Sequence, residues 1–176
     1  GAGLLATLGL AATATGGPPP TLVLRTLELH TQGTPQVPAI HRRVSVGTPQ
    51  GWAPTTPGGR RELELLGPSG EGRMIVFAGL HPSHLGALLD RLRQEHPSAA
   101  PSPPVKMELP GLRPELGERA TRFVITGQEV GEMVLVERRD TLVLVVTVVA
   151  PDAWPEVQRQ LLRVYPTITV TDLEWA

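Results

Sequence analysis

Cysteine is absent from the 176 residues of the sequence. Within this chain, that absence excludes disulfides, zinc–thiolate sites, iron–sulfur clusters, cysteine nucleophiles and lipid attachment through a cysteine. No phosphate-loop motif is present either, and no cofactor is predicted.

Aromatic residues and lysine are scarce. Three Trp, one Tyr and two Phe are the only aromatic residues, too few for a platform on which single-stranded nucleic acid stacks. Lys106 is the single lysine, and the formal net charge is -1. A nucleic-acid or anionic-membrane partner is therefore not predicted, because both favour a basic surface.

The first twenty residues differ in composition from the rest. An uncharged run of Leu, Ala, Gly and Thr ends in Ala12-Thr13-Ala14, and Pro18 to Pro20 follow. A short apolar run before a small-x-small pattern is typical of a secretory signal peptide. The alternatives are an apolar helix packed on the domain and an uncleaved membrane anchor. We expect 1–20 to be a leader plus linker, 21–176 to be one domain, and the protein to be extracytoplasmic: secreted, periplasmic or envelope-associated.

Proline and glycine, 19 of each, divide the remaining sequence into elements. Alternating or continuous apolar runs predict strands at 21–30, 40–47, 60–66, 73–80, 106–109, 119–127, 130–137, 141–150 and 167–176. The loop 67–72 makes a hairpin of the third and fourth runs. Residues 141–150 are almost continuously apolar, which predicts a central strand covered on both faces.

Two segments have helical periodicity. The first, 81–97, carries an apolar stripe of Leu85, Leu88, Leu89 and Leu92. In the second, 151–166, we expect Asp152 to cap the start and the buried face to consist of Trp154, Val157, Leu161, Leu162 and Tyr165. The order of elements predicts an α+β fold, an antiparallel sheet flanked by two main helices.

The run "VGTPQGW" at 46–52, the hairpin "ELELLGPSGEGRMIVF" at 62–77 and the segment from "GERATRFVITG" to "VQRQLLRVY" follow one another in this order. Together they resemble the PsbP-like family over about 40–166, with Pro49, Gly51 and Trp52 at the turn that bacterial members share. The resemblance is to bacterial envelope proteins of the DcrB type, and it implies an α/β/α sandwich and a non-enzymatic role. Residues 21–39 and 167–176 lie outside it, and we expect them to pair at one edge.

Several residues are candidates for chemistry. His81 and His84 have the spacing of two metal ligands, which leaves a metal-dependent hydrolase open, although helix capping and surface polarity are favoured. "GPSGEG" lacks the spacing of a nucleophile elbow or phosphate loop and is interpreted as a turn. Glu62, Glu64, Glu129, Glu132 and Glu137 alternate with arginines. Paired acids can perform general acid–base catalysis, but we expect a solvated sheet face.

Trp52 and Trp154 are the candidate binding or fold-landmark residues, together with Pro49 and Gly51. A tryptophan after a tight turn can cover the edge of an aliphatic core, or it can stack on a ligand. The sequence therefore favours a binding or assembly module for another protein or envelope component, working through a sheet edge or the proline-rich segment 97–116. The alternatives are a carrier of small hydrophobic ligands, with its pocket near Trp52 and Trp154, and the hydrolase that uses His81 and His84. A membrane would be contacted only through an uncleaved N-terminal segment.

Overall fold

The computed structural model describes residues 21–55, 61–80, 82–95 and 100–173. These residues form two α-helices and eleven strands. The helices are α2 (Pro82–Glu95) and α3 (Trp154–Val164). The strands are β1 (Leu22–Thr31), β2 (Ile40–Pro49), β3 (Ala53–Pro54), β4 (Glu62–Leu66), β5 (Arg73–Gly79), β6 (Ala100–Pro101), β7 (Val105–Met107), β8 (Arg119–Thr126), β9 (Val130–Arg138), β10 (Thr141–Val149) and β11 (Thr169–Asp172).

The main sheet is antiparallel and has β10 at its centre. Its strand order is β3-β4-β5-β10-β9-β8-β6, and β7 also pairs with β8. Leu144 of β10 lies opposite Phe77 of β5 on one side and Leu135 of β9 on the other. All nine residues of β10 are buried. The prediction of a central strand covered on both faces is confirmed.

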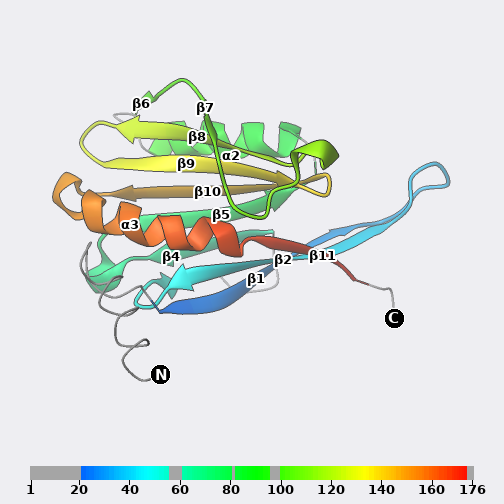
Figure 1. Ribbon diagram of the computed structural model, residues 1–176, viewed down its shortest axis with the longest axis horizontal. Helices are drawn as coiled ribbons and strands as arrows, with labels where there is room; N and C mark the ends of the chain where they lie inside the picture. Colours follow the sequence, from blue (N-terminus) through cyan, green and yellow to red (C-terminus); the bar gives the residue numbers. More distant parts are fainter. Residues whose placement is uncertain (1–20, 56–60, 81, 96–99, 174–176) are drawn as a thin grey trace, which may run out of the picture.

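Successive side chains of these strands point to opposite faces of the sheet, and each face has its own core. Val143 and Val145 of β10 belong to the larger core, which α3 and the strands β1, β2 and β11 cover. Leu144 and Val146 belong to the smaller core, which includes Leu92 of α2. Figure 1 shows α3 in front of the main sheet and α2 behind it.

The strands β1, β2 and β11 form a separate sheet in the order β1-β2-β11. The single sheet that the sequence predicted is therefore two sheets. The expected pairing of 167–176 with 21–39 is also wrong, because Thr169 of β11 lies opposite Ser45 of β2. Arg42 of β2 links this sheet to the main one, since its Nη1 donates to the carbonyl of Arg139, between β9 and β10, at 2.8 Å. The far end of the β1–β2 hairpin projects from the body (Figure 1).

Helix α3 packs its apolar face on the larger core, with two differences from the prediction. Leu161 and Tyr165 are buried as expected, but Leu162 is 55% exposed and Val164 is buried instead. Leu162 lies at the margin of the stripe, about 100° from Leu161 around the helix. Asp152 does not cap the helix either, since the N-cap residue is Ala153 and no side chain bonds there.

The α+β class, with antiparallel strands and two helices, is confirmed. Within the described part of the chain, no helix combines the length and the apolar character needed to cross a membrane.

Candidate functional site

The Pro49–Trp52 turn joins β2 to β3. The Trp52 amide donates to the Pro49 carbonyl at 3.2 Å, and Gly51 has a φ of 99°. Only glycine adopts such a positive φ without strain at the third position of a tight turn. The Gln50 amide also donates to the Thr21 carbonyl at 2.8 Å, which ties the turn to the start of β1.

The turn delivers the Trp52 ring into the larger core, where the side chain is 3% exposed. Its Cη2 atom would lie 3.3 Å from a Cβ added at Gly67 or at Gly72, so the ring packs across the base of the β4–β5 loop. In this position the ring closes the end of the core and offers no face to a ligand.

Trp154 lies at the first position of α3, half-buried against the same core. Trp175 lies outside the described residues. The two candidate tryptophans are thus both on the α3 side of the main sheet.

The candidate metal ligands are not placed by the structure. His81 and the side chain of His84 lie outside what is described. Among the described residues, no group of three or more His, Asp or Glu side chains could hold a metal ion. The hydrolase alternative stays a prediction.

Glu62 and Glu64 do not lie on an open sheet face. Glu62 pairs with Arg91 of α2, and Glu64 pairs with Arg73, which also pairs with Glu95 of α2. These ion pairs attach the helix to β4 and β5. Burial acts to raise the pKa of the Glu64 carboxyl, but hydrogen bonds from Thr55 and Arg73 outweigh burial, and the pKa is lowered.

Glu132 also differs from the prediction of a solvated face, because it is only 1% exposed. One oxygen accepts from Arg122 Nε at 2.8 Å, and the other accepts from the Tyr165 hydroxyl. Burial and the neighbouring Glu132 charge hold the pKa of Tyr165 well above its ordinary value. A buried charge needs such partners. The sequence held a signal for this burial, since Glu132 alternates in phase with the apolar Val134 and Val136.

An apolar pocket of about 230 Å³ lies between α2 and the main sheet. Its lining comes from α2, β5, β8, β9 and β10 and includes Ile75, Leu92, Ile125, Met133, Leu144 and Val146. These side chains belong to the smaller core, so the pocket lies on the face of the sheet opposite Trp52 and Trp154. The carrier alternative from the sequence placed its pocket near Trp52 and Trp154, whereas this pocket lies at the interface of the sheet with the other helix, α2.

The polar part of the lining is small. It consists of Arg73, Arg93 and Ser102. Ser102 Oγ accepts from the Val124 amide at 2.9 Å and donates to the Pro103 carbonyl at 3.1 Å. Because the hydroxyl hydrogen is used in this way, Ser102 helps to fix the segment between β6 and β7 over the sheet.

A second hollow, of about 740 Å³, lies where the segment 104–117 passes β8 and β9. Its lining is mixed and includes Lys106, Met107 and Leu109 as well as Glu118, Arg119 and Glu137. Glu118 is buried, and it accepts from the Arg113 amide at 3.0 Å. This hydrogen bond to a buried carboxylate holds the segment 104–117 in place.

No family model matches the chain, and no curated protein matches it. Among the solved structures that match is the solution structure of cyanobacterial PsbP (CyanoP) from Synechocystis sp. PCC 6803. The identity is 12% and the TM-score 0.49, and the match covers 73% of this chain and 86% of that chain. At this identity, nothing about a ligand or partner of this chain follows from the similarity.

Proposed function

We propose that this protein is a non-enzymatic binding module, and that it binds a small apolar molecule in the pocket between α2 and the main sheet. The observation that carries the proposal is the pocket itself. Binding sites for small molecules are concave, mostly apolar and equipped with a few polar groups. The described lining has this composition, with only Arg73, Arg93 and Ser102 among aliphatic and aromatic side chains.

The lining supports binding rather than catalysis. A nucleophilic serine needs a base within hydrogen-bonding reach. The Ser102 hydroxyl instead donates to a backbone carbonyl. The two arginines can orient an anion but cannot exchange protons near neutral pH.

The test is a titration with the fluorescent apolar probe N-phenyl-1-naphthylamine, whose emission rises in a dry site. We expect saturable binding to the wild type. Val146→Phe should abolish it by filling the pocket, and Leu135→Arg by placing a charge in the lining. The matched control is Val105→Phe, because Val105 is 61% exposed on β7 and lines neither hollow. Undiminished probe binding by both pocket variants, each shown to be folded by circular dichroism, would refute the proposal.

Binding of a protein is a second candidate, favoured by the hollow beneath the segment 104–117. Its lining mixes apolar side chains with both signs of charge, and the adjoining β7 leaves Val105 exposed. Such a composition resembles the polar rim of a protein interface more than a small-molecule site, which is mostly apolar. Cross-linking from a photoreactive group at Lys106, with the same group at Arg159 on α3 as the control, would identify a partner specific to this hollow.

The extracytoplasmic location and the assignment to DcrB-type envelope proteins with a PsbP-like sandwich belong to the same proposal. The apolar run that ends at Ala14 supports the first, and the Pro49, Gly51 and Trp52 turn supports the second. Expression in a bacterial host with a start codon added, followed by mass spectrometry of the mature N-terminus, tests the location. A cut after Ala14 is expected, and an intact cytoplasmic chain would contradict it.

A further inference from the structure

The charged residues that line the α2 pocket are both cationic. Arg73 and Arg93 line the pocket, and none of the described lining residues is acidic. An apolar cavity with cationic groups at its edge suits a molecule that has an apolar tail and an anionic head, because the head is then paired as it leaves water.

The two arginines are not equally available. Arg73 is engaged by Glu64 of β4 and by Glu95 of α2, so its charge is balanced by groups that attach the helix. Arg93 pairs with Asp90 at 3.3 Å, and both side chains are about two-thirds exposed, at 67% and 71%. An exposed pair of this kind contributes little, so Arg93 can exchange Asp90 for a ligand anion.

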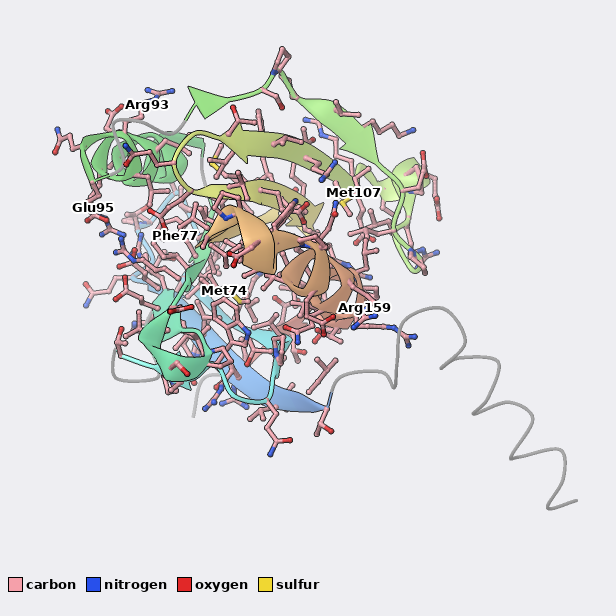
Figure 2. The ribbon with its side chains drawn as sticks, turned by 90° about the vertical axis from the view of Figure 1, so that its left-hand side faces the viewer. Met74, Phe77, Arg93, Glu95, Met107 and Arg159 are labelled. Carbon is pink, nitrogen blue, oxygen red and sulfur yellow. The ribbon has the colours of Figure 1, made fainter. Side chains whose placement is uncertain are left out.

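The position of Arg93 fits this role. In Figure 2, where α2 is seen nearly end-on, Arg93 and Glu95 project to different sides of the helix. Glu95 reaches towards Arg73 and the β5 side of the helix, whereas Arg93 lies over the pocket. The ion pairs of Arg73 and Arg91 therefore hold one side of α2 to the sheet and leave the Arg93 side to the ligand.

The volume limits the length of the tail. An apolar cavity of roughly 150 Å³ binds benzene, which has six carbons. By the same scale, a pocket of about 230 Å³ has room for a tail of about eight carbons. Longer tails would have to leave part of their length in water.

We infer that the pocket binds a medium-chain carboxylate of about eight carbons, with the tail over β9 and β10 and the carboxylate on Arg93. This inference rests on the proposed function and adds the chemical class of the ligand. It predicts that Arg93 alone binds the head group. The apolar lining should bind the tail equally well with any head group.

The experiment compares octanoate, 1-octanol and octylamine, each titrated by calorimetry and by displacement of N-phenyl-1-naphthylamine. We expect octanoate to bind most tightly to the wild type and octylamine most weakly. Arg93→Gln should weaken octanoate by roughly two- to fivefold, the effect of one ion pair to an exposed arginine, and leave 1-octanol unchanged. Arg93→Glu should reverse the order of octanoate and octylamine.

The matched control is Arg159→Gln. Arg159 forms an ion pair with Glu156 three residues away on α3, as Arg93 does with Asp90 on α2. Figure 2 places it on the far side of the molecule from Arg93. The control makes the same change of net charge, and we expect it to leave all three affinities unchanged.

The outcomes separate the inference from the proposed function. Equal affinities for octanoate and 1-octanol, or equal losses of both in Arg93→Gln, would overturn the role of Arg93 while leaving an apolar binding site. Failure of all three ligands and of the probe to bind would overturn the proposed function as well. Selective loss of octanoate, with the order reversed in Arg93→Glu, supports both.

Discussion

Tyr165 and Glu132, 33 residues apart in the sequence, meet in the core on the α3 side of the sheet, where the tyrosine hydroxyl donates to the carboxylate. The other carboxylate oxygen accepts from Arg122. This contact joins the end of α3 to β9 and fixes the helix along the sheet. It lies on the face opposite the pocket, so the two can be perturbed separately.

Tyr165→Phe should destabilise the protein by about 1.5–3 kcal/mol, because it leaves a buried carboxylate oxygen without its donor. The measurement is the free energy of unfolding from urea titration. Leu162→Ala, an exposed position on α3, is the control and should change it by less than about 0.5 kcal/mol. If Tyr165→Phe behaves like this control, the contact does not stabilise the fold. Probe binding should be the same in both variants.

Gly70 and Gly72 allow backbone strain and close packing to be separated. Both have positive φ, 74° and 83°, but a Cβ at Gly70 meets nothing, whereas one at Gly72 would lie 2.8 Å from Val149 Cγ1. Gly70→Ala should cost about 1–2 kcal/mol from strain alone, and Gly72→Ala should cost more. The Val149→Ala background should reduce the excess for Gly72→Ala. Equal costs of the two glycine variants in the wild-type background would contradict the packing at Gly72.

Trp52 should report a dry environment that ligands do not reach. In a Trp154→Phe/Trp175→Phe variant the remaining emission comes from Trp52, and we expect it to be blue-shifted and poorly quenched by acrylamide, because the ring is buried in the larger core. Addition of 1-octanol should leave it unchanged, since the pocket is on the other face. A ligand-dependent shift would restore the idea that this ring stacks on the ligand.

The Glu64 carboxylate should contribute to stability in a pH-dependent way. Its pKa in the folded protein lies below its ordinary value of 4.5. The contribution is therefore fully present above that value and is lost as the pH falls through the folded pKa. The difference in unfolding free energy between wild type and Glu64→Gln should therefore become smaller as the pH is lowered from about 7 to about 3.

Thr55→Val provides a graded test of the same effect. Thr55 donates to Glu64 at 2.8 Å, so its removal should raise the pKa of Glu64 towards the ordinary value and reduce the pH-dependent difference. If the unfolding free energies of wild type and Glu64→Gln change in parallel with pH, the ion pair and hydrogen bond of Glu64 do not lower its pKa.

The sequence predicted those features that depend on neighbours along the chain. The continuous apolar run of β10, the β4–β5 hairpin and the stripe that buries Leu161 and Tyr165 were all placed correctly. The turn at Gly51 also followed from local chemistry, since its φ of 99° suits glycine. Each of these features is decided within a few residues.

What the sequence did not predict depends on contacts between distant segments. Local alternation predicts a strand within 167–176, but not that Thr169 pairs with Ser45 rather than with β1. Similarly, an acidic residue in a strand is usually solvated, and the partners that allow Glu132 to be buried come from β8 and from the end of α3. The pocket depends on how α2 rests on the sheet, which the Glu62–Arg91 and Glu95–Arg73 pairs decide.

The three methionines provide the most direct measurement of where a ligand binds. Met133 lines the pocket, Met74 lies in the core on the opposite face, and Met107 lines the second hollow. Met74 and Met107 are labelled in Figure 2. In a protein labelled with ¹³C at the methionine methyl groups, Met133→Leu assigns the pocket resonance. Addition of octanoate should move the Met133 signal and leave those of Met74 and Met107 in place. A shift at Met107 alone, or at none of the three, would contradict binding beneath α2.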